Sequence, residues 1–266
     1  MVIVIMGVIG GMVSVFMKGP IDAYFASTKR AALTDVADTT VRRIARDLHR
    51  ALPNSIRNDG TTSCLEFVPT KTGGRYRTQG TGALDFSSAV SSFNMLGDYA
   101  NFAGTAQPAD QKIAANDLIA IYNLGGGISG ADVYVSANTN YSPVTSVGTV
   151  SGNETPISIT AKQFPLASAS NRFHVVSATE KMVSYVCSAS TLFRTVSNTL
   201  TATASCPTSG SKIATNVDCS STGFSITDSG NALSRNALVS MRLTIRDSAS
   251  VESVTLHHEV HVDSTP

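Results

Sequence analysis

The segment MVIVIMGVIGGMVSVFM, residues 1–17, decides the fold, because it carries no charged side chain before Lys18. A helix of this length spans about 25 Å, slightly less than the hydrocarbon core of a bilayer. A cleaved signal peptide would begin with basic residues and end in a small-residue cleavage site, and neither pattern occurs here. We therefore interpret residues 1–17 as a membrane segment whose apolar part began further upstream. Its main apolar side chains are Val2, Ile3, Val4, Ile5, Val8, Ile9, Val13, Val15 and Phe16.

Gly19 and Pro20 follow this segment, and a proline inside a helix removes one hydrogen bond, so a kink and a break are expected at 19–20. From 31 to 52, apolar residues recur at steps of three and four, which predicts one apolar stripe along a second, amphipathic half. This half should pack on a globular domain, and Pro53 should end it. The stripe consists of Leu33, Val36, Val41, Ile44, Leu48 and Leu52.

The opposite side of residues 31–52 carries the basic set Arg42, Arg43, Arg46 and Arg50. Nucleic acid or anionic lipid could bind such a patch, but no aromatic residue is interleaved for base stacking. The formal net charge of the 266-residue chain is only +1, so there is no general basic excess to neutralise phosphates. We therefore expect no nucleic-acid partner, and we interpret this face as solvated or as a contact with neighbouring subunits.

Residues 53–266 show the pattern of a β-rich domain, so the fold class is predicted as α+β with an antiparallel sheet. Short alternating runs predict strands, and neighbouring runs are close enough for hairpins; in the run at 237–247, Val239 and Leu243 should face inward. Stretches rich in Gly, Ser, Asn and Thr at 97–112 and 137–160 are expected to be long polar loops. The predicted strands cover 117–123, 132–136, 172–178, 181–188, 191–196, 237–247 and 253–262.

The chain has four cysteines and no Cys-x-x-Cys pair, which argues against a zinc ribbon or a thioredoxin motif. An even number behind an anchor-like segment predicts two disulfides in an oxidising compartment. Sequence alone does not choose among the pairings. We favour Cys206–Cys219, which closes a short loop, together with Cys64–Cys187, which closes a long one; free buried thiols are the alternative.

Two patterns invite a ligand-binding interpretation. The run Gly125–Gly130 satisfies G-x-G-x-x-G, but a dinucleotide site needs a helix to follow, and the next residues predict a strand. We interpret this run as a flexible hairpin loop. In the last predicted strand, His257, Glu259 and His261 alternate, so they would share one face and could bind zinc or a similar ion. An exposed strand face shows the same alternation without a metal, so this site is a minor hypothesis. No cofactor is expected.

An apolar stretch, a Gly/Pro break and an amphipathic half that runs into a β domain resemble the type IV pilin and pseudopilin family. The closer similarity is to the MshO-type minor pilins of the mannose-sensitive haemagglutinin (MSHA) pilus system. It rests on RRIARDLHRALPNSIR (42–57), CLEFVPTKTGGRYR (64–77), LDFSS (84–88) and the C-terminal run at 235–266. The G-F-T-L-I-E signature of prepilins is not in this sequence, so we expect it to lie upstream or to have been removed.

This resemblance implies a minor pilin that takes part in priming, or in the tip complex, of an MSHA-like pilus and so supports attachment to surfaces. Its partners would be other major and minor pilin subunits, the inner-membrane assembly platform, and the membrane itself. The chain would be a single-pass inner-membrane protein with a periplasmic C-terminal domain. It would later be part of the cell-surface pilus, at its tip, with residues 1–17 in the filament core. Two further hypotheses are a tip adhesin and a membrane-anchored periplasmic enzyme. No G-x-S-x-G or H-E-x-x-H motif occurs, and no catalytic residue is predicted.

Overall fold

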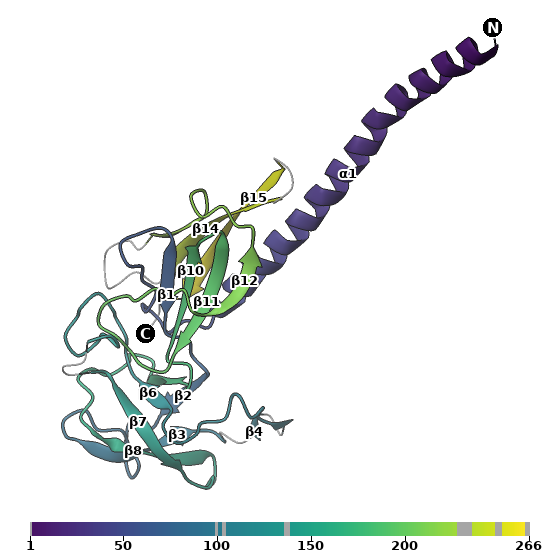
Figure 1. The fold of residues 1–266 in the computed structure, drawn as a ribbon. Helices are drawn as coiled ribbons and strands as arrows, with labels where there is room; N and C mark the ends of the chain where they lie inside the picture. Colours follow the sequence, from purple (N-terminus) through teal and green to yellow (C-terminus); the bar gives the residue numbers. More distant parts are fainter. Residues whose placement is uncertain are drawn as a thin grey trace.

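The computed structural model describes residues 2–98, 101–102, 105–135, 139–227, 236–247 and 252–263. One long helix, α1 (Val2–Leu48), leaves a body of antiparallel strands, and the N-terminus lies far from that body (Figure 1). The predicted α+β class, with an N-terminal helix and antiparallel strands, is therefore confirmed. The body also contains a closed barrel, which the sequence did not predict.

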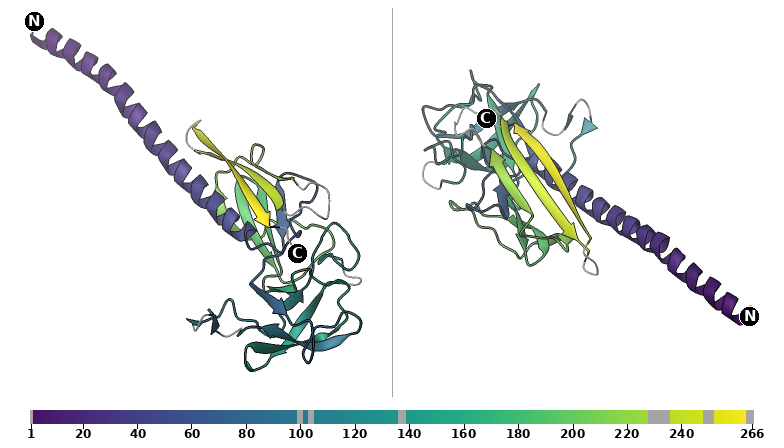
Figure 2. Two further views of the ribbon diagram at one scale, coloured as in Figure 1. Left: turned by 180° about the vertical axis from the view of Figure 1, so that it is seen from behind. Right: turned by 90° about the horizontal axis from the view of Figure 1, so that it is seen from above.

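Two sheets form the part of the body that contacts α1. The four-stranded sheet has the order β1-β10-β11-β12, with β1 (Cys64–Phe67), β10 (Met182–Ser188), β11 (Thr191–Ser197) and β12 (Ser211–Thr215). The three-stranded sheet has the order β13-β14-β15, with β13 (Gly223–Thr227), β14 (Asn236–Arg246) and β15 (Ser253–Asp263). Seen from above, this second sheet lies over the part of α1 that meets the body (Figure 2).

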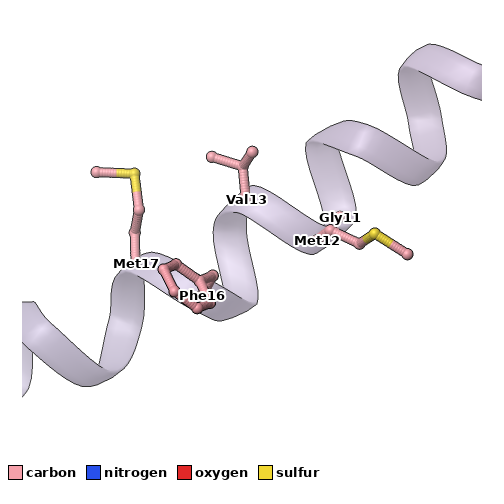
Figure 3. A pocket seen from close by; sticks show the side chains of 5 residues that line it. All are labelled: Gly11, Met12, Val13, Phe16 and Met17. Carbon is pink, nitrogen blue, oxygen red and sulfur yellow. The ribbon is translucent and has the colours of Figure 1, made fainter.

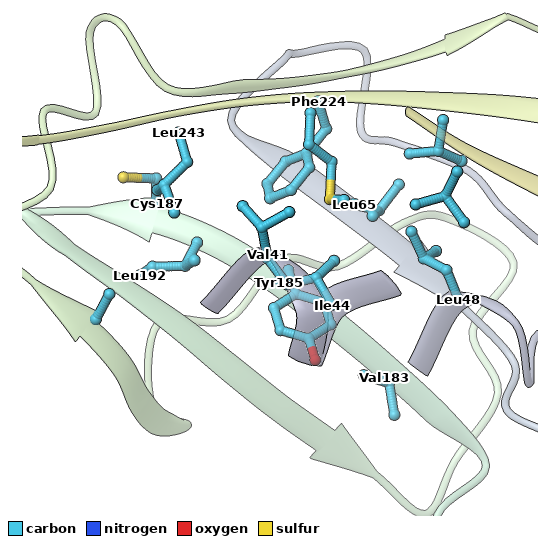
Figure 4. Packing of buried hydrophobic residues seen from close by; sticks show 14 of the residues in the cluster. Val41, Ile44, Leu48, Leu65, Val183, Tyr185, Cys187, Leu192, Phe224 and Leu243 are labelled. Carbon is cyan, nitrogen blue, oxygen red and sulfur yellow. The ribbon is translucent and has the colours of Figure 1, made fainter. Parts of the chain in front are cut away.

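The second half of α1 packs between these sheets. Its buried side chains include Val41 and Ile44, which share one core with Tyr185 of the four-stranded sheet and Leu243 of the three-stranded sheet (Figure 4). Burial of each large apolar side chain contributes roughly 1.5–3 kcal/mol. The amphipathic pattern therefore predicts the packing of this half correctly: strands cover its apolar stripe, and its polar face is exposed to solvent.

The helix differs from its predicted course at the proline. α1 continues through Gly19 and Pro20, so the predicted break at 19–20 is wrong. Proline has a helical φ and removes one hydrogen bond, so the turns on both sides can hold the helix together. The helix then ends at Leu48, and not at residue 52.

Two residues of the predicted stripe lie elsewhere. Val36 is 44% exposed, whereas its neighbour Ala37 is fully buried. One residue turns a helix by about 100°, so Val36 falls outside the stripe that Ala37 belongs to. Leu52 is buried, but it follows the helix and packs with Val68 and Leu118 in a separate cluster. Leu33 is partly buried against the core, as predicted, and Leu48 is fully buried.

A six-stranded barrel is inserted between β1 and β10. Those two strands are hydrogen-bonded neighbours, and Phe67 lies opposite Val183, so the inserted segment 68–181 leaves the body and returns to it at one place. The barrel lies at the end of the molecule away from the N-terminus of α1 (Figure 1). In the order β2-β3-β8-β7-β6-β9, its strands are β2 (Thr72–Tyr76), β3 (Val90–Leu96), β8 (Glu154–Lys162), β7 (Tyr141–Val147), β6 (Leu118–Ala120) and β9 (Arg172–Val176). A separate small pair joins β4 (Asn101–Phe102) and β5 (Thr105–Ala106).

Most predicted strands are present, and β10–β11 and β14–β15 form hairpins. In β14, Val239 and Leu243 are buried as predicted, whereas residues 248–250, between β14 and β15, lie outside the described residues. The strand at 172–178 corresponds to β9, but β9 pairs with β2 and β6 and not with β10, so that predicted hairpin is wrong.

Two other predictions for the barrel are wrong. The segment 137–160 is not one polar loop, because it contains β7 and most of β8. Its Ser and Thr residues alternate with inward-facing Val144, Ile157 and Ile159, which is the period of a strand. The predicted strand at 132–136 is instead a turn as far as residue 135, held by Asp132 Oδ1, which accepts the N–H of Tyr134 at 2.9 Å; Ser136 lies outside the described residues.

The disulfides pair as Cys64–Cys206 and Cys187–Cys219, so the favoured pairing is wrong although the prediction of two disulfides is confirmed. The reason is the register of β1 on β10. Cys64 lies opposite Val186, and successive residues of a strand point to opposite faces, so Cys187 points away from Cys64. Cys187 faces the core between the sheets, where Cys219 reaches it.

Candidate functional site

The candidate functional surface is the apolar first half of α1. Its side chains lie in the open: Ile3 is 87% exposed and Phe16 is 83% exposed. An 18-residue window of this helix has a mean hydropathy of 2.0 and no part of it is buried, so the helix is long and apolar enough to cross a membrane. The predicted side chains here are exposed, including Val2, Val4, Ile5, Val8, Ile9 and Val13; the side chain of Val15 lies outside the described residues.

A shallow apolar hollow lies on this half of the helix, between residues 11 and 17. Met12, Val13, Phe16 and Met17 line it together with Gly11, whose missing side chain leaves the backbone accessible (Figure 3). Because the hollow lies on a helix that no other described element covers, it is an open packing surface and not an enclosed ligand cavity. Lipid tails or another apolar helix would fit it.

Ion pairs attach the middle of α1 to Asp247, which follows β14, and to Glu252, which precedes β15. Lys29 Nζ lies 2.9 Å from Asp247 Oδ2, and Arg30 contacts Glu252 at 2.7 and 3.2 Å. The hydrogen bond from Arg30 lowers the pKa of Glu252 below its ordinary value. These pairs are exposed, so salt screens them, and they orient the helix more than they stabilise it.

A more sheltered network holds the end of α1 against the four-stranded sheet. Arg194 of β11 contacts Asp47 of the helix at 2.7 Å and Glu180 at 2.6 Å. The Tyr185 hydroxyl donates to the same Asp47 carboxylate at 2.8 Å. Burial, and then the Asp47 charge, raise the pKa of Tyr185, so this hydroxyl keeps its proton. The exposed first half of α1 is thus carried by a second half that is fixed on the body.

The basic set is exposed: Arg42, Arg43 and Arg46 lie on α1 opposite the buried stripe, and Arg50 lies just after the helix. Arg42 contacts Asp38 at 2.7 Å, and Arg50 donates to the Thr70 carbonyl at 3.3 Å. Arg43 and Arg46 make no hydrogen bond or ion pair with any described residue. The expectation that this face is solvated or contacts other subunits stays a prediction.

The glycine-rich run Gly125–Gly130 is a barrel loop that packs against Asn54, in the segment that follows α1. Gly125 has φ +64°, and a Cβ there would lie 2.2 Å from the Asn54 carbonyl oxygen, so no other residue fits. Buried Asn123 donates to the Pro53 carbonyl at 2.7 Å and accepts the N–H of Val133 at 2.8 Å. The residues described after this run form turns and no helix, so the phosphate-binding geometry is not built here.

The histidine set of β15 is exposed and is not assembled as a metal site. His257 and Glu259 line a shallow hollow on the three-stranded sheet, and His261 lies outside it. Among the described residues, the group of ligand atoms within 4.8 Å of one another is Asp59, Cys64 and Cys206, and both cysteines are in a disulfide.

A buried carboxylate fixes the barrel to the rest of the body. Asp117, at the start of β6, accepts from Lys71 Nζ at 2.9 Å on the segment that enters the barrel. It also accepts the N–H of Ala178 at 2.9 Å on the segment that leaves it, and the N–H of Ala114 at 2.8 Å. One side chain therefore holds both connecting segments together.

We expect Asp117→Asn to loosen this junction, because the amide nitrogen cannot accept the hydrogen bonds that the lost carboxylate oxygen accepted. A buried charged hydrogen bond contributes about 1.5–3 kcal/mol, so the free energy of unfolding should fall by roughly that amount. Urea unfolding and amide hydrogen exchange at Ala178 would measure it. Asp110→Asn, an exposed change in the same segment, is the control; equal stability of the two variants would contradict the assignment.

A second buried ion pair lies where β1, the segment that follows α1 and the barrel meet. The side chain of Glu66 is fully buried and accepts from Arg57 at 2.8 and 2.5 Å. The Arg57 guanidinium stacks on the ring of Tyr134, 3.4 Å from its centroid. Burial raises the pKa of Glu66, and the hydrogen bonds from Arg57 oppose that shift. Tyr134 in turn donates to the Ser55 carbonyl at 2.7 Å.

Sequence reasoning did not identify Asp117, Glu66 or Arg57. A signal was present for Glu66, because an acidic residue inside the apolar run CLEF must be paired if the strand is buried. Comparison of the chain with protein families, with curated proteins and with solved structures found no match.

Proposed function

We propose that this chain is a minor pilin or pseudopilin that takes part in the assembly of a type IV, MSHA-like pilus, at the priming step or in the tip complex. The observation that carries the proposal is the division of α1: an exposed apolar half extends from a half that is packed between two sheets. A subunit built this way has an exposed apolar helix that can associate with lipid or with other helices, and a folded β-rich body.

The physical logic follows from burial. Each large apolar side chain left in water costs roughly 1.5–3 kcal/mol, so the exposed half of α1 needs a bilayer or a bundle of similar helices around it. In the proposal, the helix lies in the inner membrane with the β-rich body in the periplasm, and then enters the filament among the helices of major and minor subunits. The assembly platform of the inner membrane performs that transfer.

The test is genetic and structural. Cells that lack the gene should carry few or no pili by electron microscopy, and the full chain supplied in trans should restore them. Cross-linking in membranes should recover the chain with other pilin subunits. Normal numbers of pili in the deletion strain, with no cross-linked pilin, would contradict the proposal.

A tip adhesin is the second candidate, and the inserted barrel favours it, because this module lies farthest from the N-terminus of α1 (Figure 1). Phe67 and Val183 are paired, so a short turn between them can replace the whole barrel. If the barrel binds a surface, cells with the barrel-less chain should assemble pili but lose attachment. If the chain serves assembly alone, both properties should survive.

A further inference from the structure

We propose that the outer face of the barrel holds an oxyanion-binding site formed by Arg75, Arg172 and His174, which would take a phosphate, sulfate or carboxylate group. These residues line an open hollow of about 270 Å³, whose floor is the backbone at Gly73 and Gly74. The site belongs to the barrel, so the inference does not depend on the filament role.

The first observation is a pair of like charges. Arg75 of β2 lies directly opposite Arg172 of β9, and both side chains are exposed. Side chains directly opposite on antiparallel strands have Cβ atoms about 5 Å apart, and like charges there are destabilising. Neither arginine makes a hydrogen bond or an ion pair with any residue that the structure describes. An anion between the two guanidinium groups would remove the repulsion and satisfy their donors.

The second observation is an unsatisfied imidazole. His174 lies beside Gly73 in the register of β9 on β2, two residues from Arg172 on the same outer face. Its Nε2 atom is buried and has no hydrogen-bond partner among the described residues. Burial, and then the charge of Arg172, lower the pKa of His174 from its ordinary 6.5 to about 4. An oxyanion bound in the hollow would favour the protonated form of the His174 ring by its charge.

The third observation is the open floor. Gly73 has no side chain beside His174, and a Cβ there would lie 2.9 Å from the Phe173 carbonyl oxygen. The hollow therefore depends on glycine. Its volume suits one small oxyanion or the anionic group of a larger molecule, because pockets for whole drug-sized ligands are larger, about 300–1,000 Å³.

The other groups around the hollow leave it positive. The cross-strand neighbours Leu96 of β3 and Ala120 of β6 are uncharged. Lys71, just before β2, is already paired with Asp117. Asp263 at the end of β15 raises the pKa of His174 and so opposes an added anion. We therefore expect Asp263→Asn to bind oxyanions more tightly than the parent chain.

The test is titration of the full chain in detergent micelles with sodium sulfate at constant ionic strength, followed by calorimetry and by the histidine ring ¹⁵N signals. Saturable binding is expected, with the His174 signal shifting and the affinity rising as the pH falls from 7 towards 4. Arg75→Gln and Arg172→Gln should each weaken binding about tenfold, the effect expected for loss of one charged hydrogen bond. Arg43→Gln changes an exposed arginine on α1 that pairs with no described residue; it is the matched control and should change nothing.

A second arm identifies the source of the oxyanion. Inorganic phosphate and a phosphorylated or sulfated monosaccharide are titrated separately; tighter binding of the sugar indicates an anion carried on a larger ligand, and equal binding indicates a free ion. Thermal melting checks that each variant is folded. Absence of saturable sulfate binding, or equal affinity in the parent and in the folded Arg75→Gln/Arg172→Gln double variant, would overturn the proposal.

Discussion

Replacing Ile9 and Val13 together by aspartate is expected to release the chain from membranes. The two side chains lie one turn apart in the exposed apolar half of α1. An aspartate at the centre of a membrane helix costs about 2.5–3.5 kcal/mol, so two should cost about 5–7 kcal/mol. That cost lowers the partition coefficient of the helix into the bilayer by about 1,000-fold or more. The fraction of chain that stays with membranes after an alkaline carbonate wash measures the effect.

The matched control for this experiment is Ile9→Leu/Val13→Leu, which changes the same positions and keeps them apolar. It should remain in the membrane fraction and assemble as the parent does. If the aspartate variant also stayed membrane-bound and entered filaments normally, the apolar half of α1 would not be the anchor.

The second large effect is expected from Arg57→Met. This change leaves the fully buried Glu66 carboxylate without its guanidinium partner, and removing one member of a buried ion pair costs about 3–5 kcal/mol. Urea denaturation of the full chain in micelles should show the loss as a lower midpoint with an unchanged slope. Stacking of Arg57 on Tyr134 is lost as well, which adds to the effect.

The double variant Arg57→Met/Glu66→Met is the control, because it removes both charges and should regain most of the lost stability. The pH dependence gives a separate check. The folded-state pKa of Glu66 is already raised, and without Arg57 it should rise further. A carboxyl with a raised folded pKa costs stability above that pKa, so the single variant should become more stable as the pH falls towards the ordinary value near 4.5. A single variant no less stable than the double would contradict this view of the pair.

Periodicity predicted the parts of the fold that one segment determines by itself. The buried stripe of α1 at Val41, Ile44 and Leu48 repeats every three or four residues, and β14 alternates cleanly, so both were predictable. Val36 shows the limit of the method, because a residue at the edge of a stripe is decided by which neighbours pack there.

The barrel could not be predicted because its strands are joined by contacts between distant segments. β2 contains Gly73 and Gly74, which interrupt the alternation that marks a strand, and it pairs with β9 a hundred residues later in the order of the chain. The disulfide pairing could not be predicted for the same reason, because the face of β10 on which Cys187 lies relative to Cys64 depends on the register with β1. The two arginines of the proposed oxyanion site are likewise far apart in sequence and meet only across β2 and β9.

The place where the barrel joins the body sets how the molecule would carry tension. Both connecting segments emerge from the same end of the four-stranded sheet, next to the pair Phe67 and Val183. A pull on the barrel therefore draws β1 and β10 lengthwise in one direction and shears β10 along β11, whose seven paired positions resist together instead of opening one by one. A barrel attached to a surface, in a molecule whose α1 is held elsewhere, would need a connection that resists shear in this way.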